Sequence, residues 1–190
     1  MVEILVQRQG PLDHLAGTRG VAVELLAVPP RAKFALRCRA DAVAPVGQTF
    51  GIALPREACR AAVAGDRAAL WLGPDEWLVL AEEGDAEAIS GQIEAALAGL
   101  AGTHHSCVDV SHRSCGLTVK GPHAATVINH GCPLDLSHAS FPDGMCTRTL
   151  FEKAEIILWR VEMHAYHVEI ERSFAPYVWN MLIEVREEFE

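Results

Sequence analysis

The chain has 190 residues, of which 50% are hydrophobic, so it is long enough to bury a core as one domain or as two closely joined halves. Its formal net charge of −9 disfavours nucleic acids and anionic membranes as partners, because both would repel an acidic surface. No apolar run approaches the ~18 residues of a membrane span. Residues 1–8 lack the basic lead and long apolar segment of a secretory signal. We therefore expect a globular protein of the cytoplasm.

The first 66 residues give the weakest signals. An amphipathic pattern ends at Pro29-Pro30, and Phe34, Leu36 and Cys38 then alternate with polar or small residues as in a half-buried strand. Residues 41–66 are rich in Ala, Pro and Gly and indicate at most one helical turn near 56–63. We divide the chain into an N-terminal arm and first strand region (1–66) and an α+β domain (67–190), which forms one compact unit with the arm.

Residues 68–81 predict a hairpin about a turn at Pro74-Asp75. In this register Trp71 faces Leu78, and both faces are apolar, so the hairpin is expected in the interior or against a partner. A helix follows from Asp85, which we expect to cap it, towards Gly102, with Ile89 and Leu97 among the residues of its apolar stripe.

The stretch 108–149 is read as a second hairpin followed by a short helix. With the turn at Arg113-Ser114, one face is apolar and the other polar, and a helix between Pro122 and Gly131 follows. Strands at 146–151, 155–161 and 164–170 and a last helix from Ser173 complete the chain. This order of ββα units predicts an α+β fold of antiparallel sheets with helices packed on them.

Two groups of residues invite a chemical interpretation. The first is a zinc site of His and Cys side chains, but the predicted hairpin places His105 and His112 roughly 23 Å apart along one extended strand. The second is a Cys nucleophile, for which nothing nearby would lower the thiol pKa. The zinc candidates are His104, His105, Cys107, His112 and Cys115, and the nucleophile candidate is Cys132 with His130, Asp135 or His138.

Other features favour structural roles. Asp75 and Glu76 are adjacent in a turn and are expected to be solvated, and no dinucleotide or nucleotide-binding loop is present. The six cysteines form no C-x-x-C pair, which indicates reduced thiols rather than a disulfide framework. Trp71, Trp77 and Trp159 are expected in the core, with partner contact as the alternative. We therefore assign no catalytic, cofactor-binding or metal residue to this chain.

Eight short motifs give a resemblance over about residues 70 to 180. They are GPDEWL (73–78), VDVSHR (108–113), GP (121–122), GCPLDL (131–136), FP (141–142), CTRT (146–149), WR (159–160) and RSFA (172–175). Together they resemble the gamma-subunit family of heterotetrameric sarcosine oxidases. The resemblance implies a fold similar to the folate-binding domain of aminomethyltransferases.

The resemblance also implies a function. Such complexes demethylate sarcosine oxidatively to glycine, reduce oxygen to hydrogen peroxide, and pass the one-carbon unit to tetrahydrofolate or release formaldehyde. FAD and FMN are expected in the beta subunit and at its interface with alpha, NAD and tetrahydrofolate in alpha, and zinc in delta. The gamma subunit is then a non-catalytic partner of alpha, and whether this chain is itself an enzyme stays open. The alternatives are a free-standing folate-binding aminomethyltransferase-like protein and a small redox or metal protein.

Overall fold

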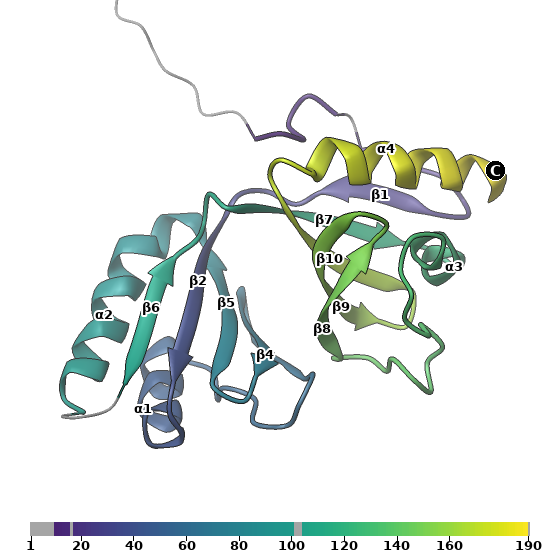
Figure 1. Ribbon diagram of the computed structural model, residues 1–190. Coiled ribbons are helices and arrows are strands. Elements are labelled where there is room, and N and C mark those ends of the chain that lie inside the picture. The colour runs from purple at the N-terminus through teal and green to yellow at the C-terminus, as the bar shows by residue number, and fades with distance from the viewer. Residues whose placement is uncertain (1–9, 16, 101–103, 190) are drawn as a thin grey trace, which may run out of the picture.

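The computed structural model describes residues 10–15, 17–100 and 104–189, which form two five-stranded antiparallel sheets with helices on their outer faces (Figure 1). Sheet A has the order β1-β7-β10-β9-β8 and sheet B the order β3-β4-β5-β2-β6. The strands are β1 (Glu24–Ala27), β2 (Arg31–Cys38), β3 (Ala61–Ala64), β4 (Arg67–Gly73), β5 (Glu76–Glu82), β6 (His105–Asp109), β7 (Ser114–Lys120), β8 (Cys146–Phe151), β9 (Ala154–Glu162) and β10 (Ala165–Glu171). The fold is α+β, as predicted.

Four α-helices within the described residues cover the sheets. They are α1 (Ala40–Phe50), α2 (Ala86–Ala98), α3 (Ala124–Asn129) and α4 (Ala175–Arg186), and the 3-10 turns η1 (Glu83–Asp85) and η2 (Glu187–Phe189) adjoin α2 and α4. Figure 1 shows α1 and α2 outside sheet B, and α3 and α4 on the side of sheet A. In the part of the chain that the structure describes, no helix is long and apolar enough to cross a membrane. The prediction for residues 1–8 and the helix end expected at Gly102 lie outside the described residues.

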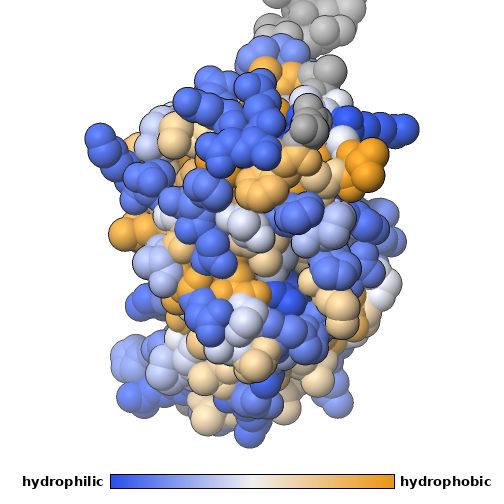
Figure 2. Space-filling model, turned by 90° about the vertical axis from the view of Figure 1, so that its right-hand side faces the viewer, coloured by the Kyte–Doolittle hydropathy of each residue, from blue (hydrophilic) through white to orange (hydrophobic). Residues whose placement is uncertain are grey.

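Three buried apolar clusters correspond to the layers. One lies between sheet A and helices α3 and α4, and a second lies between sheet B and helices α1 and α2. The third joins the two sheets and contains Leu70 and Leu78 of sheet B with Cys146 and Trp159 of sheet A. The inner faces of both sheets are therefore buried against each other at their centre. Figure 2 shows the side of the molecule on which α3 lies, where hydrophobic residues form small patches among hydrophilic ones.

The two halves of the molecule repeat one topology. Sheet B is built from β2, α1, β3, β4, β5, α2 and β6, and sheet A from β7, α3, β8, β9, β10, α4 and β1. Written in the corresponding order, the sheets read β3-β4-β5-β2-β6 and β8-β9-β10-β7-β1. Strand β6, at one edge of sheet B, follows α2 in the chain. Its counterpart in sheet A is β1, which lies beside β7 but comes from the N-terminal part of the chain. The order of the second half is thus circularly permuted relative to the first.

The predicted hairpin at 108–119 is wrong. Strand β6 pairs with β2 in sheet B, while β7 pairs with β1 and β10 in sheet A. The four residues between them, 110–113, carry the chain from one sheet to the other. The alternation of apolar and polar residues was correct for β7, where Leu117 and Val119 are buried, but wrong for β6, where Val108 is exposed and Cys107 packs against the core of sheet B. Alternation also does not specify which partner a strand takes.

The hairpin of β4 and β5 is confirmed, with one change of register. Trp71 lies opposite Trp77 rather than Leu78, because a β-bulge shifts the pairing between Trp71 and Gly73. As a result Trp71 and Trp77 face α1 and α2, and Leu70 and Leu78 face sheet A. Both faces are apolar and covered, as expected.

Other elements match or extend the predictions. The hairpin of β8 and β9 turns at Glu152 and Lys153, and α3 ends before Gly131, both as expected. Helix α1 was not predicted, and residues 57–60 form a bend, a turn and a bridge rather than a helical turn. Asp85 precedes α2 but makes no side-chain cap hydrogen bond. Strand β2 pairs with β5, so residues on both sides of the expected division at residue 66 share sheet B.

Candidate functional site

A buried ion network joins the two sheets. Lys33 of β2 and Glu169 of β10 are each 3% exposed, and the Lys33 Nζ lies 2.6 Å from the Glu169 Oε2. Ser114 at the start of β7 donates its hydroxyl to the same Oε2 at 2.7 Å, and the His167 Nε2 donates to the other carboxylate oxygen at 2.9 Å. The Lys33 ammonium also donates to the carbonyl and hydroxyl oxygens of Ser114. Every partner belongs to the inter-sheet region.

The electrostatics hold Glu169 in its ionised form. Burial alone would raise the pKa of this carboxyl, but the hydrogen bond and charge of His167 and the charge of Lys33 outweigh burial and lower the pKa to about 2. The three donors of the Lys33 ammonium are directed to Ser114 and Glu169. Since these groups satisfy one another, the network is suited to fixing the two sheets together rather than to proton transfer.

Glycine at position 116 permits this arrangement. A Cβ built there would lie 2.8 Å from the His167 Cε1 and 3.0 Å from the Val28 Cβ. Any side chain on this part of β7 would displace the His167 ring, which also packs edge-on against Trp159 with ring centroids 5.9 Å apart. The close approach of β7 to the network therefore requires glycine.

A second ionic link lies at the mouth of the inter-sheet space. The carboxylate of Glu76 in β5 accepts from Arg37 of β2 at 2.5 Å and from Arg148 of β8. The hydrogen bond from Arg148 is the main reason that the pKa of Glu76 is lowered. The expectation that Glu76 is a solvated turn residue is wrong, because its side chain is only 14% exposed and ties sheet B to sheet A.

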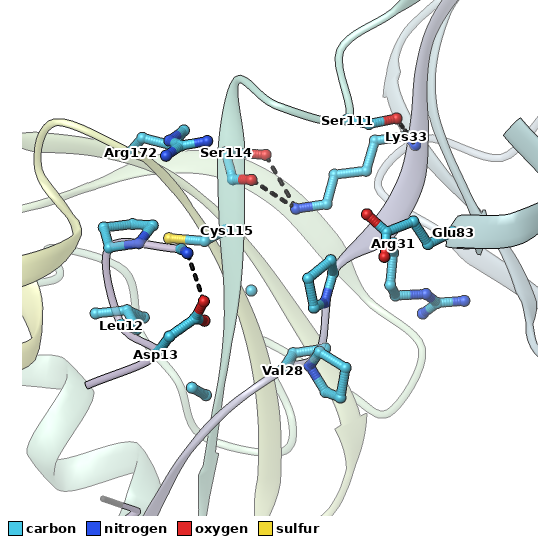
Figure 3. Close-up of a pocket in the computed structure, with 16 residues that line it drawn as sticks. Leu12, Asp13, Val28, Arg31, Lys33, Glu83, Ser111, Ser114, Cys115 and Arg172 are labelled. Carbon is cyan, nitrogen blue, oxygen red and sulfur yellow. Dashed lines mark hydrogen bonds between the residues drawn. The ribbon is translucent and has the colours of Figure 1, made fainter. Parts of the chain in front are cut away.

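A cavity of about 190 Å³ adjoins the ion network. Figure 3 shows that segment 10–13, the stretch from Val28 to Lys33 and strand β7 surround it, with Arg172 at one end. Its wall includes Lys33 and Ser114, but the polar atoms of those residues point to each other. The volume is below the roughly 300–1,000 Å³ typical of pockets for drug-sized ligands.

The zinc candidates are divided between the sheets. His105 and Cys107 belong to β6, Cys115 belongs to β7, and His112 lies in the crossing between them. Among the described residues, no three His, Cys, Asp or Glu side chains form a group that could hold a metal ion. Burial raises the pKa of Cys107 and of Cys115 to about 11, which disfavours the thiolate that a metal requires.

The candidate nucleophile Cys132 lacks a catalytic geometry. Its Sγ lies 3.8 Å from the Thr149 hydroxyl, and the three proposed partners have other contacts. His130 contacts Thr126 and Glu188, Asp135 accepts from Ser137 and Ser140, and His138 lies beside Arg160 and Asp143. Cys132 is 3% exposed and belongs to the core of sheet A.

The tryptophans lie largely in the core. Trp77 is 2% exposed and its Nε1 donates to the Pro55 carbonyl at 2.8 Å, and Trp159 is 7% exposed between the sheets. Trp71 is half-buried against the core of sheet B.

Sequence reasoning missed the Lys33–Glu169 network. The available signal was a charged residue between two apolar neighbours in each strand, Lys33 between Ala32 and Phe34 and Glu169 between Val168 and Ile170.

Comparisons with known proteins give consistent results. The model of the "Sarcosine oxidase, gamma subunit family" matches residues 37–188. The chain is 29% identical to a sarcosine oxidase subunit gamma from an Arthrobacter species, over 197 residues that cover 100% of this chain and 95% of the relative. It is also 29% identical, over 199 residues with the same coverage, to the corresponding subunit of Corynebacterium sp. strain P-1.

Solved structures extend this likeness to the fold. A chain of the heterotetrameric sarcosine oxidase from Corynebacterium sp. U-96, solved in complex with pyrrole 2-carboxylate, superposes with a TM-score of 0.86 at 28% identity, with 96% of both chains covered. Aminomethyltransferase T of the glycine cleavage system from Bartonella henselae shares the fold, with a TM-score of 0.64 at 12% identity over 86% of this chain and 46% of that one. Since the family model spans most of the sequence, the chain belongs to the sarcosine oxidase gamma subunit family.

Proposed function

We propose that this chain is a non-catalytic accessory subunit that packs on the alpha subunit of a cytoplasmic sarcosine oxidase and stabilises its assembly with beta and delta. The observation that carries the proposal is the likeness to a chain of a heterotetrameric sarcosine oxidase over 96% of both chains. The inter-sheet ion network supports it, because its charged groups are directed to one another and hold the scaffold rigid.

In this proposal the chemistry belongs to the other subunits. The complex converts sarcosine, oxygen and water to glycine, formaldehyde and hydrogen peroxide, or transfers the one-carbon unit to tetrahydrofolate in place of releasing formaldehyde. FAD, FMN, NAD, tetrahydrofolate and zinc are bound outside this chain. The cavity of about 190 Å³ beside Lys33, with its donors already engaged, offers poor accommodation for a folate.

Co-purification tests the proposal. The tagged chain is expressed with the putative alpha, beta and delta subunits, and flavin absorbance and sarcosine-dependent peroxide production are recorded for the eluate. We expect yellow, active material that contains the larger subunits. A colourless chain eluting alone would contradict the proposal.

The alternative is a free-standing folate-binding protein, which the shared fold with aminomethyltransferase T favours. This chain spans only 46% of that protein, so a large part of the neighbour has no counterpart here. Titration of the isolated chain with tetrahydrofolate, followed by fluorescence of the buried tryptophans, separates the two functions. Saturable binding by the isolated chain supports the alternative, and its absence supports the accessory role.

A further inference from the structure

Strand β8 has an open segment on the outer edge of sheet A. Within the described ranges β9 is the one strand that pairs with β8, so alternate backbone groups point away from the sheet, at residues 146, 148, 150 and 152. The N–H of Cys146 donates to the Cys59 carbonyl at 2.9 Å, and that of Glu152 donates to the Gly131 carbonyl at 2.7 Å. Between them, the N–H groups of Arg148 and Leu150 have no backbone acceptor within the described part of the chain.

The side chains beside this open edge leave an apolar surface. Leu150 lies on the same face of β8 as Cys146 and Arg148, the face turned towards sheet B, and it is 50% exposed. Next to it a small hollow opens between the sheets, lined by apolar residues that include Val110 and Ile157 and by Arg148. An unpaired edge with an exposed leucine is a site at which another strand can be added.

The charges around the hollow indicate the character of such a strand. Glu155 lies directly opposite Leu150 in the β8–β9 register, and Glu171 lines the same hollow. Both carboxylates are exposed and have no ion-pair partner among the residues described. Two cations line the same hollow, Arg113 and Arg148, and Arg148 is already paired with Glu76. A basic side chain would therefore be favoured near Glu155.

We propose that an extended segment of another subunit of the oxidase adds to β8 as a sixth strand of sheet A. In this arrangement the segment exchanges backbone hydrogen bonds with Arg148 and Leu150. One of its apolar side chains packs on Leu150, and one of its basic side chains lies near Glu155. A second copy of this chain is disfavoured as the occupant, since each copy carries a net charge of −9. The inference rests on the proposed function and adds the contact surface to it.

Three variants of the tagged chain, co-expressed with the other subunits, test the surface. Leu150→Glu removes the apolar contact and places a second acid beside Glu155, so we expect capture of the partner subunits to weaken about tenfold. Leu150→Pro removes an outward N–H without removing a β8–β9 hydrogen bond, and the same loss is expected. Glu155→Lys should weaken capture through repulsion of the basic side chain.

Val63→Glu is the matched control. Val63 is 57% exposed on β3, the edge strand of sheet B that corresponds to β8 in sheet A. It therefore presents a similar apolar side chain on the equivalent edge of the other sheet. We expect Val63→Glu to leave capture unchanged. An equal loss for Val63→Glu and Leu150→Glu would overturn the assignment to β8.

Amide hydrogen exchange provides a readout that does not depend on any variant. The amides of Arg148 and Leu150 should exchange fast in the free chain and slowly in the complex. Equal exchange in both states would refute the added strand, as would protection that appears in the isolated chain through self-association. If the wild-type chain captures no partner, the proposed function fails. If wild type and Leu150→Glu capture partners equally, only the strand addition fails.

Discussion

Lys33 and Glu169 are the residues on which the junction of the two sheets depends most. Replacing Lys33 by Met leaves the buried Glu169 carboxylate without its ammonium partner. We expect the free energy of unfolding to fall by about 3–5 kcal/mol, measured by urea denaturation, because an uncompensated buried charge is strongly destabilising. Lys120→Met is the control, since Lys120 and Glu162 are both more than half exposed and such pairs contribute about 0–1 kcal/mol. Equal losses would contradict the role assigned to the network.

The same carboxylate predicts a dependence of stability on pH. The pKa of Glu169 is lowered from 4.5 to about 2 in the folded chain, so its contribution is fully present above pH 4.5 and is lost as pH falls towards 2. Urea denaturation at several pH values should therefore show a steeper acid loss for the wild type than for Glu169→Gln. If the stability of the two proteins changed with pH in parallel, the Glu169 carboxylate would not contribute to the acid loss as proposed.

Sequence patterns at the scale of residues predicted which side chains are buried better than which side chains pair with one another. The apolar character of Trp77 and of both faces of its hairpin follows from the sequence, and these residues are buried. Lys33 was placed on the polar side of a half-buried strand, because a lysine between apolar residues normally marks solvent. Its burial depends on Glu169, 136 residues further along the chain, and local periodicity contains no information about such a pair.

At the scale of elements, pairing was the weakest part of the prediction. Helix α1 was missed because Pro45 lies inside it and the segment is rich in Ala and Gly. The crossing at 110–113 was read as a turn, since short polar segments connect strands within a sheet as readily as between sheets. The bulge between Trp71 and Gly73 reversed the faces of β4 relative to the expectation.

Glycine 121 gives a test of how β1 is held. Its φ is +136°, and a Cβ there would lie 2.4 Å from the Ala22 carbonyl oxygen, in the backbone that leads into β1. We expect Gly121→Ala to destabilise the fold by at least about 2 kcal/mol, through backbone strain and displacement of β1. Gly91→Ala in the exposed middle of α2, where a Cβ meets open space, should stabilise by about 0.5–1 kcal/mol. Thermal unfolding should therefore show a lower melting temperature for Gly121→Ala and a higher melting temperature for Gly91→Ala than for the wild type.

At the scale of the whole molecule, the repeated topology could not be predicted. The sequence shows no internal repeat in residue identities, although two similar ββα units are visible. The permuted position of β1 hides the correspondence further, because the second half takes its last strand from the beginning of the chain. Two sheets with the same strand order can thus be formed by unrelated side chains, provided that each sheet keeps its apolar faces.

The permuted repeat predicts that the chain tolerates a new order. Phe189 and Val21 line one surface hollow, so the C-terminal turn η2 lies beside the segment that leads into β1, and a flexible linker can connect the two termini. With the chain opened between His112 and Arg113, in the crossing between the sheets, each half becomes contiguous and α4 leads into β1 as α2 leads into β6. We expect this permutant to fold cooperatively and to capture the same partner subunits as the wild type. If it instead collapses into a state without cooperative unfolding, the covalent crossing at 110–113 is required to hold the sheets, and their mutual packing alone is insufficient.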